Sequence, residues 1–425
     1  MGRAIAIVGA GQSGLQLALG LVKNNYAVTL IANRTAEQVL KGRILSTQVM
    51  FSPALYHERK IGIDFWQKRA PQNTSITFAL SDPTTHKRGV YWKALTKPYQ
   101  AVDQRVKFST WLNEFQRLGG ELIIDDIDIE KLNRLSKVYD LTIVAAGKGA
   151  LSNAFARDSI RSRFEKPMRS LACAYVKGME PKKENPGVRI NIIPNVGEYF
   201  TVPGITTTGH CEMVLFEGIP GQALDCWSGI KTPEEFLQQI KYLLKTYVPW
   251  EAERCQNISL TDPLATLSGK MTPIIRQPVF KTTSEKPILG IADTLVLNDP
   301  IAGQGANNAS FCAAIYLARI LANGNKPFNE PWMRETFDLF WHQRGRSSTN
   351  LSNLLLLPPE PHIMKLLNDA SDTPLLAKAI VAGFGEPNSL FPWMLDPKQA
   401  EYMTSLFKKE QEEQEATHAN FRPRE

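Results

Sequence analysis

The sequence has few cysteines, and their spacing excludes a metal site or a disulfide framework built on them. The five cysteines are scattered singly over 425 residues, with no C-x-x-C pair and no cluster with histidine. Such a set is typical of reduced thiols in the cytoplasm. We therefore predict a cytoplasmic protein without a metal site. The chain enters an apolar strand pattern at once, which predicts no signal peptide.

Long apolar runs and blocks of like charge are also missing. The run that comes nearest, residues 351–357, stops at a Pro-Pro pair and is far too short to cross a bilayer. The net charge of +7 is spread along the chain. This distribution favours solubility or attraction of an anionic ligand over nucleic-acid binding. We expect neither a nucleic acid nor a membrane as a partner.

No Ser-His-Asp arrangement and no paired-carboxylate signature stands out. The histidines His57, His86 and His210 occur singly, and each is expected to be structural or exposed. A shortage of acid–base groups is compatible with chemistry that a bound cofactor carries.

The clearest positive signal is a glycine motif at the N-terminus. Apolar residues 5–8 predict a buried parallel strand, and Gly9, Gly11 and Gly14 follow in G-x-G-x-x-G spacing before an apolar helix. The first glycine allows the tight turn, the second lets the backbone approach a pyrophosphate, and the third lets the helix pack on the strand. Ser13 belongs to the helix start, whose N–H groups would face phosphates. The motif predicts dinucleotide binding, with a glycine-tolerant turn as the alternative.

The second predicted strand, residues 27–31, ends without the acid that often holds ribose hydroxyls. Asn33 could still hydrogen-bond a ribose, and Arg34 could stack on adenine or face a phosphate; a polar loop is the alternative. Farther along, Arg43 could face the pyrophosphate or the ring of a flavin, or lie on the surface. The departure at Asn33 weakens a plain NAD site.

Changes of pattern divide the chain into regions. Residues 1–165 and 287–330 predict a discontinuous Rossmann-like nucleotide-binding domain with a β-meander inserted around 50–95. Short strands and turns in residues 166–286 predict a mainly antiparallel substrate domain. Helical patterns cover 331–408, and the charged segment 409–425 predicts a disordered tail. The expected fold class is α/β with an α+β insertion.

A second glycine loop follows the predicted strand at residues 287–293. The strand ends near Asp293, and the loop leads into an apolar helix through Pro300, Gly303, Gln304, Gly305, Ala306 and Asn307. Backbone N–H groups at a helix N-terminus suit an anion or a delocalised negative charge.

Together these motifs resemble the flavoprotein monooxygenases of the aromatic hydroxylase fold. The glycine start, the Arg43 loop, Arg105 before a helix, and the segment from Asp293 to Asn307 occur in the same order. The resemblance implies that Asp293 binds the ribityl chain of FAD and that Arg105 contacts the cofactor. It also implies that the helix start at residues 300–307 stabilises negative charge on the reduced flavin.

A narrower resemblance is to the styrene and indole monooxygenases, the oxygenase components of two-component systems. Segments 42–47, 101–105 and 298–307 are similar to theirs. Single-component hydroxylases usually carry Asp-Gly where this chain has Ala146-Gly147. The resemblance therefore implies no built-in nicotinamide site, and a separate NAD(P)H:flavin reductase that supplies reduced FAD. Residues 46–50 depart from the styrene monooxygenase pattern, so the substrate could be neither styrene nor indole.

The predicted function is insertion of one oxygen atom into a small apolar aromatic or alkene substrate. Reduced FAD would bind, O2 would add at C4a, and the hydroperoxide would transfer the oxygen. Thr47 could hydrogen-bond the hydroperoxide or a nearby water, and Ser46 is assigned with it to the reacting end. The alternatives are a single-component NAD(P)H-dependent hydroxylase and a non-catalytic flavin-binding redox module.

A flavin-dependent halogenase shares the fold, but its Trp-x-Trp-x-Ile-Pro segment is missing from this sequence. The oligomeric state stays open, with a homodimer as one option.

Overall fold

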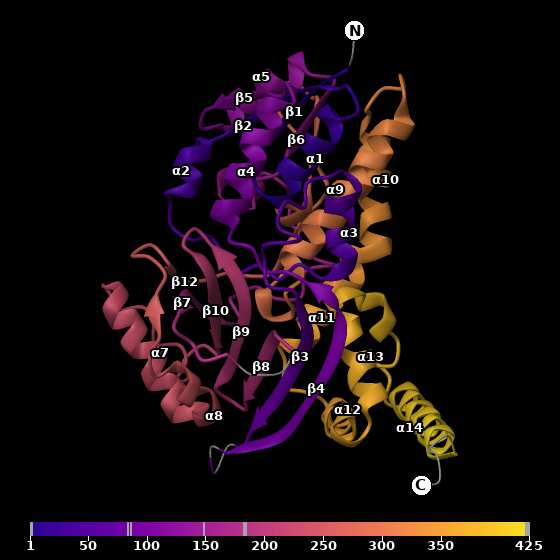
Figure 1. The fold of residues 1–425 in the computed structure, drawn as a ribbon. Coiled ribbons are helices and arrows are strands. Elements are labelled where there is room, and N and C mark those ends of the chain that lie inside the picture. The colour runs from indigo at the N-terminus through magenta and orange to yellow at the C-terminus, as the bar shows by residue number, and fades with distance from the viewer. Residues whose placement is uncertain (1–2, 83–84, 86, 148, 182–184, 421–425) are drawn as a thin grey trace.

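The computed structural model describes residues 3–82, 85, 87–147, 149–181 and 185–420, and it is framed by two β-sheets (Figure 1). In spatial order the six-stranded sheet contains β14 (Val279–Lys281), β15 (Pro287–Gly290), β6 (Leu141–Val144), β1 (Ala4–Val8), β2 (Ala27–Ala32) and β5 (Glu121–Ile124). All but β14 are parallel. The central strands β1, β2 and β6 are mostly apolar and almost wholly buried, as expected where helices cover both faces of a parallel sheet.

Helices α1 (Gln12–Val22) and α9 (Gln304–Asn323) pack against each other in this part of the molecule, and α4 (Gln104–Arg117) packs beside α1. Shorter helices complete it: α2 (Ala36–Leu40), α3 (Ser52–Lys60), α5 (Ile129–Val138) and α6 (Ala150–Asn153). Loops at the carboxyl ends of β1, β2, β5 and β6 face the second sheet, and this edge is where ligands bind in sheets of this kind.

The eight-stranded sheet contains, in order, β11 (Ser259–Leu260), β7 (Ser170–Lys177), β10 (Gly209–Gly218), β9 (Gly197–Thr206), β8 (Gly187–Ile193), β3 (Asn73–Ser81) and β4 (Arg88–Tyr99), with β12 (Thr266–Lys270) also on β7. Only β3 and β8 pair in parallel. A third, two-stranded sheet joins β13 (Ile274–Ile275) to β16 (Val296–Leu297). The predicted α/β class with a mainly antiparallel second sheet is confirmed.

The two antiparallel strands predicted within residues 50–95 are present as β3 and β4, but the rest of this segment differs from a β-meander inserted in the first domain. Its first part forms helix α3, and the hairpin β3–β4 joins the second sheet through β8. The reason is long-range pairing: β3 alternates apolar and polar residues, but the pattern alone does not say which sheet the strand joins.

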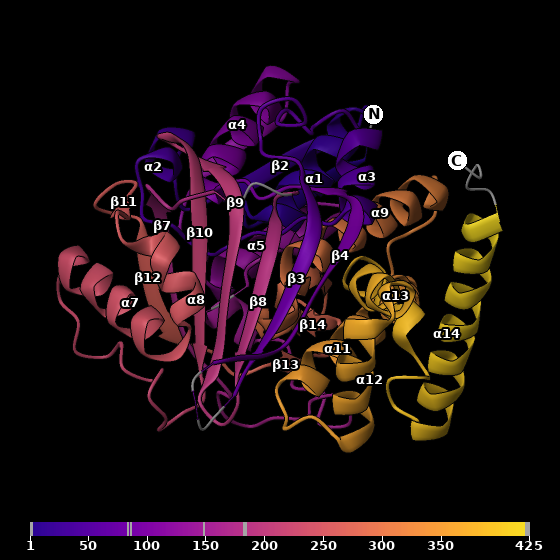
Figure 2. The same cartoon turned by 60° about the horizontal axis from the view of Figure 1, so that its bottom comes forward.

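Helices cover both faces of the second sheet (Figure 2). Helix α7 (Pro233–Tyr247), followed by α8 (Pro249–Ala252) and the 3-10 turn η1 (Glu253–Cys255), packs Phe236, Ile240 and Leu243 against one face. Of the C-terminal helices, α12 (Pro361–Asp372) and α13 (Pro374–Gly385) pack beside β4. Helix α10 (Glu330–Phe340) packs on α9 and β14, and α11 (Arg346–Leu355) also contacts α9. The π-helical turn η4 (Trp341–Gly345) lies between α10 and α11, and the 3-10 turn η5 (Pro387–Leu390) follows α13.

The last helix corrects the predicted disordered tail. Helix α14 (Pro397–Asn420) continues through residues 409–420, while 421–425 lie outside the described residues. Glu, Gln, Lys and Ala dominate this stretch, and all are strong helix formers. Lys409 and Glu413 also form an i,i+4 ion pair at 3.9 Å. Within the described ranges, none of the helices combines the length and apolar character needed to cross a membrane.

Candidate functional site

The first glycine loop has the geometry that the motif predicts. Gly9 adopts φ +117°, and a Cβ there would lie 2.5 Å from the carbonyl oxygen of Ala145. A Cβ at Gly14 would lie 2.1 Å from the carbonyl oxygen of Gly9, so the helix could not pack this closely on the strand. A Cβ at Gly11 would meet nothing within 4 Å. Because no side chain caps α1 at Gly11, its first N–H groups are left for a ligand.

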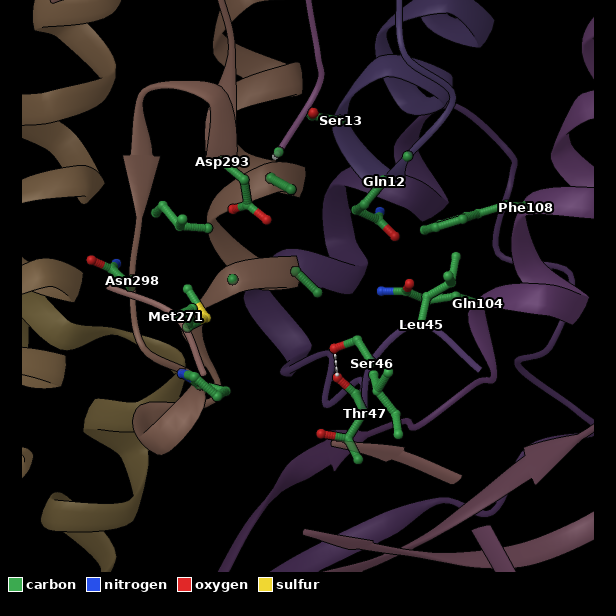
Figure 3. Close-up of a pocket in the computed structure, with 18 of the residues that line it drawn as sticks. Gln12, Ser13, Leu45, Ser46, Thr47, Gln104, Phe108, Met271, Asp293 and Asn298 are labelled. Atoms are coloured by element: carbon green, nitrogen blue, oxygen red, sulfur yellow. Dashed lines mark hydrogen bonds between the residues drawn. The ribbon is translucent and has the colours of Figure 1, made fainter. Parts of the chain in front are cut away.

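A cavity of about 1140 Å³ runs from this loop to the second sheet. Figure 3 shows Gln12 and Asp293 projecting into it, with Ser46 and Thr47 lying farther toward the strands of the second sheet. The cavity therefore joins the carboxyl edge of the parallel sheet to one face of the antiparallel sheet.

Most of the predicted site residues line this cavity. They are Gly9, Gly11, Ser13, Asn33, Arg34, Ser46, Thr47, Asp293, Pro300, Gly303, Gly305 and Ala306. The remaining five, Gly14, Arg43, Arg105, Gln304 and Asn307, do not line it. For each of these five residues, the local structure explains why it does not line the cavity.

Arg105 departs from the expected cofactor contact, because its guanidinium is committed inside the protein. The residue is 2% exposed. Its Nε donates to Asp103 at 2.9 Å, and its two terminal nitrogens donate to Asp262 at 3.1 and 2.9 Å. Further donation goes to the Gly42 carbonyl and the Thr206 hydroxyl. Arg105 therefore braces the loop that carries Gly42 instead of reaching the cavity.

Gln304 and Asn307 act in the same way on the second glycine loop. The amide of Gln304 donates to the carbonyls of Ala302 and Phe384. The amide of Asn307 donates to Val49 and Gly303, and its oxygen accepts from the Phe51 N–H. Both side chains are fully buried, so they hold the loop shape that exposes Gly303, Gly305 and Ala306.

Arg43 lies on the surface, which was the alternative for this residue. Its side chain is exposed and donates to the Thr266 carbonyl at 3.2 Å. The residues that follow it, Leu45, Ser46 and Thr47, line the cavity in its place.

The two residues predicted at the reacting end are held by their own loop. The Ser46 hydroxyl donates to the Thr47 carbonyl at 2.7 Å (Figure 3), and the Tyr175 hydroxyl donates to the Ser46 carbonyl at 2.5 Å. The Ser46 proton is thus engaged with the backbone. Thr47 lines the cavity, and its role as a hydrogen-bonding group stays a prediction.

Several further residues line the cavity that the sequence did not single out. Gln12 is the first residue of α1, and its amide donates to Gln16 and to Glu58. Gln104 and Phe108 lie one turn apart on α4, and residues 125–128 follow β5 at the carboxyl edge. Helical i,i+4 spacing next to Arg105 and the position after a parallel strand were the available signals.

The far end of the cavity is apolar because alternate residues of four strands face it. These are Leu171 and Cys173 on β7, Val188 and Ile190 on β8, Phe200 and Val202 on β9, and Met213 and Leu215 on β10. Side chains two residues apart lie on one face of a sheet. This end can hold an uncharged apolar molecule.

A buried cluster of charge lies where the second glycine loop meets the second sheet. Arg169 binds Glu198 with two nitrogens, at 2.7 and 2.8 Å. Glu217 and Asp299 are fully buried beside this pair, and both carboxylate oxygens of Glu217 and Oδ2 of Asp299 have no hydrogen-bond partner among the described residues. Burial, with Asp299 and Glu198 adding to it, raises the pKa of Glu217 well above its usual value. Burial also raises the pKa of Asp299.

The donor set fits a dinucleotide cofactor. Helices α1 and α9 both begin without a side-chain cap, at loops that line the cavity. A Cβ at Gly305, like one at Gly11, would meet nothing within 4 Å. Asp293 projects into the space between the two helices (Figure 3). In the part of the chain that the structure describes, no group of three or more His, Cys, Asp or Glu side chains is placed to hold a metal.

Residues 147–254 match the family model described as the styrene monooxygenase A putative substrate binding domain. The styrene monooxygenase of Pseudomonas fluorescens is 28% identical over 409 residues, which cover 94% of this chain and 97% of that protein. This confirms the predicted resemblance to the styrene monooxygenases, and it extends over nearly the full length.

Solved structures show the fold. A flavin-dependent brominase, Bmp2, superimposes with a TM-score of 0.66 at 13% identity, covering 98% of this chain and all of that one. The p-nitrophenol 4-monooxygenase of Pseudomonas putida has a TM-score of 0.61 at 13% identity, covering 91% of this chain and 98% of that one.

Proposed function

Because the chain is a relative of the styrene monooxygenases along nearly its whole length, we propose that it is an FAD-dependent monooxygenase. It uses reduced FAD and O2 to insert one oxygen atom, by epoxidation or hydroxylation, into a small apolar aromatic or alkene substrate. One observation carries the proposal: a single cavity joins two uncapped helix N-termini to an apolar sheet face.

The residues at the nucleotide end divide the binding of FAD among them. The N–H groups at Gly11 and the start of α1 would hold the pyrophosphate. Asp293 would accept hydrogen bonds from the ribityl hydroxyls, and Asn33 and Arg34 would lie at the adenosine end. The N-terminus of α9 would lie beside the pyrimidine part of the flavin ring.

Reduced flavin, when bound, reacts with O2 and supplies the oxygen atom. The chain's own part is to orient the substrate and to exclude water. The alternate apolar residues of β7 to β10 do both, since they offer no hydrogen bonds to a hydroxylated competitor. Thr47 supplies the hydrogen-bonding hydroxyl between this wall and the flavin end.

We also propose that a separate NAD(P)H:flavin reductase supplies the reduced FAD. Ala146 and Gly147 line the cavity, and a Cβ at Gly147 would lie 3.4 Å from the Cβ of Asp293. The acid that single-component hydroxylases usually carry at Ala146 is missing, which supports the absence of a nicotinamide site.

A product assay under 18O2 tests the proposal. The protein is mixed with chemically reduced FAD and offered styrene, indole and a panel of related aromatic alkenes, beside a reaction with NADH and oxidised FAD. The expected result is a product with one labelled oxygen atom in the first reaction and no NADH consumption in the second. Failure of every panel member in the first reaction, or rapid NADH oxidation in the second, would contradict the proposal.

A further inference from the structure

A buried arginine lies directly behind the first turn of α9. Arg344 belongs to the π-helical turn η4 and is 2% exposed. Its terminal nitrogens donate to the side-chain oxygen of Gln304 and to the carbonyl of Gly385, both at 2.7 Å. Its Nε donates to Asn308 at 3.3 Å, and the guanidinium lies 4.5 Å from the ring centroid of Phe311. All of these partners are neutral.

The charge of Arg344 is barely compensated. Among the described residues, Glu386 is the carboxylate within ion-pair distance, at 3.9 Å, and its side chain is 56% exposed. Burial lowers the pKa of Arg344 to about 10, against the opposing effect of Glu386, so the side chain stays a cation at neutral pH. His57 packs on Phe311 at 4.6 Å, but burial lowers its pKa to about 4, so it is neutral there.

An isolated buried charge is unfavourable for folding, and none of the three acceptors that Arg344 binds requires a charged donor. The position of the charge is therefore informative. Gln304 lies between Gly303 and Gly305, and Gly385 follows Phe384; Gly303, Gly305 and Phe384 all line the cavity. Arg344 is thus one residue removed from the cavity wall. The positive end of the α9 dipole faces the same wall.

We propose that the charge of Arg344 makes this end of the cavity prefer the anionic reduced flavin ring over the neutral oxidised ring. The inference rests on the proposed function. Arg344 acts through α9, so it is a positioning residue. The phosphates of FAD are the same in both redox states, so their attraction to Arg344 cancels in the ratio of the two affinities. A buried unit charge acting through the cavity wall on a second unit charge, at an effective dielectric constant of about 20, corresponds to a preference on the order of tenfold.

The test compares two substitutions that damage the hydrogen bonds similarly but differ in charge. Arg344→Lys keeps the cation, and Arg344→Gln keeps donors without it. The Kd of oxidised FAD is measured by calorimetry, and the Kd of dithionite-reduced FAD by anaerobic fluorescence titration. The preference is expressed as the Kd of oxidised FAD divided by the Kd of reduced FAD. We expect this ratio to stay within about twofold of wild type in R344K and to fall about tenfold in R344Q. A tenfold change equals about 30 mV for a two-electron couple.

Equal ratios in the two variants would overturn the inference, because a structural role weakens both redox states alike. If neither variant folds, the surface substitution Glu386→Gln decides the matter. Removing this partial counter-charge should raise the preference for reduced FAD about twofold, and an unchanged ratio would overturn the inference. A wild-type protein that binds neither form of FAD would contradict the proposed function instead.

Discussion

The two ends of the cavity are built in different ways. At the nucleotide end, glycines present backbone N–H groups, while Arg105, Gln304 and Asn307 turn away from the cavity and hold the loops in shape. At the substrate end, side chains such as Ile190 and Val202 form the wall themselves. A substitution at the first end should therefore act through backbone shape, and one at the second end through side-chain size.

The largest effect should come from Arg105→Met. It would leave Asp103, which is fully buried, and Asp262 without their cation, and breaking a buried pair in this way lowers the free energy of unfolding by about 3–5 kcal/mol. Urea unfolding of the flavin-free protein measures this. Arg43→Met is the matched control, with a change below about 0.5 kcal/mol. Normal stability of R105M combined with lost FAD affinity would mean that Arg105 contacts the cofactor after all.

The same substitution, glycine to alanine, should affect different properties at two positions of the first glycine loop: protein stability at one and FAD affinity at the other. Gly14→Ala places a Cβ 2.1 Å from the Gly9 carbonyl oxygen and should lower the free energy of unfolding by about 3 kcal/mol. Gly11→Ala meets no protein atom within 4 Å, so stability should hold while the Kd for FAD rises at least about tenfold. Thermal unfolding and FAD titration of both variants separate these outcomes. Equal losses of stability in the two variants would contradict this expectation.

At the substrate end, Val202→Phe should change selectivity by filling space. The added ring projects from β9 toward the apolar part of the cavity. We expect KM for a bicyclic substrate to rise about tenfold, KM for a monocyclic one to change about twofold, and FAD affinity to stay unchanged. Steady-state kinetics with reduced FAD measures this. Equal effects on both substrates would place the substrate elsewhere.

The smallest effect concerns the carboxyl pair where the two ends meet. Because burial raises the pKa of Glu217, the native state keeps a proton above pH 4.5 that the unfolded chain releases. The free energy of unfolding therefore falls as pH rises through that range. Glu217→Gln removes this titration and should make the fall between pH 6 and 9 smaller than in the wild type. Urea unfolding at both pH values measures it, with the exposed Glu234→Gln expected to behave as wild type.

How far the sequence could predict the site follows from the same comparison. The glycine motif determines a local backbone shape, so the tight turn at Gly9 and the close helix packing at Gly14 could be predicted from spacing alone. The buried ion pairs of Arg105 could not, because its partner Asp262 lies 157 residues away. The apolar wall could be recognised only as alternating patterns, since each strand reveals one apolar face but not its neighbours.

The same limit explains the two errors in the fold. The hairpin β3–β4 joined the second sheet through its pairing with β8, which no local pattern specifies. The segment 409–420 was expected to be disordered because it lacks an apolar stripe, yet strong helix formers extend α14 from its docked first turns.

The most direct test of the central claim is stopped-flow absorbance of the protein loaded anaerobically with reduced FAD and mixed with oxygenated buffer. A long-lived flavin species, distinct from reduced and oxidised FAD, should form before oxidised flavin appears. A parallel mixture with oxidised FAD and NADH should show no NADH consumption. Immediate return of oxidised flavin, even with aromatic substrates present, would contradict the account.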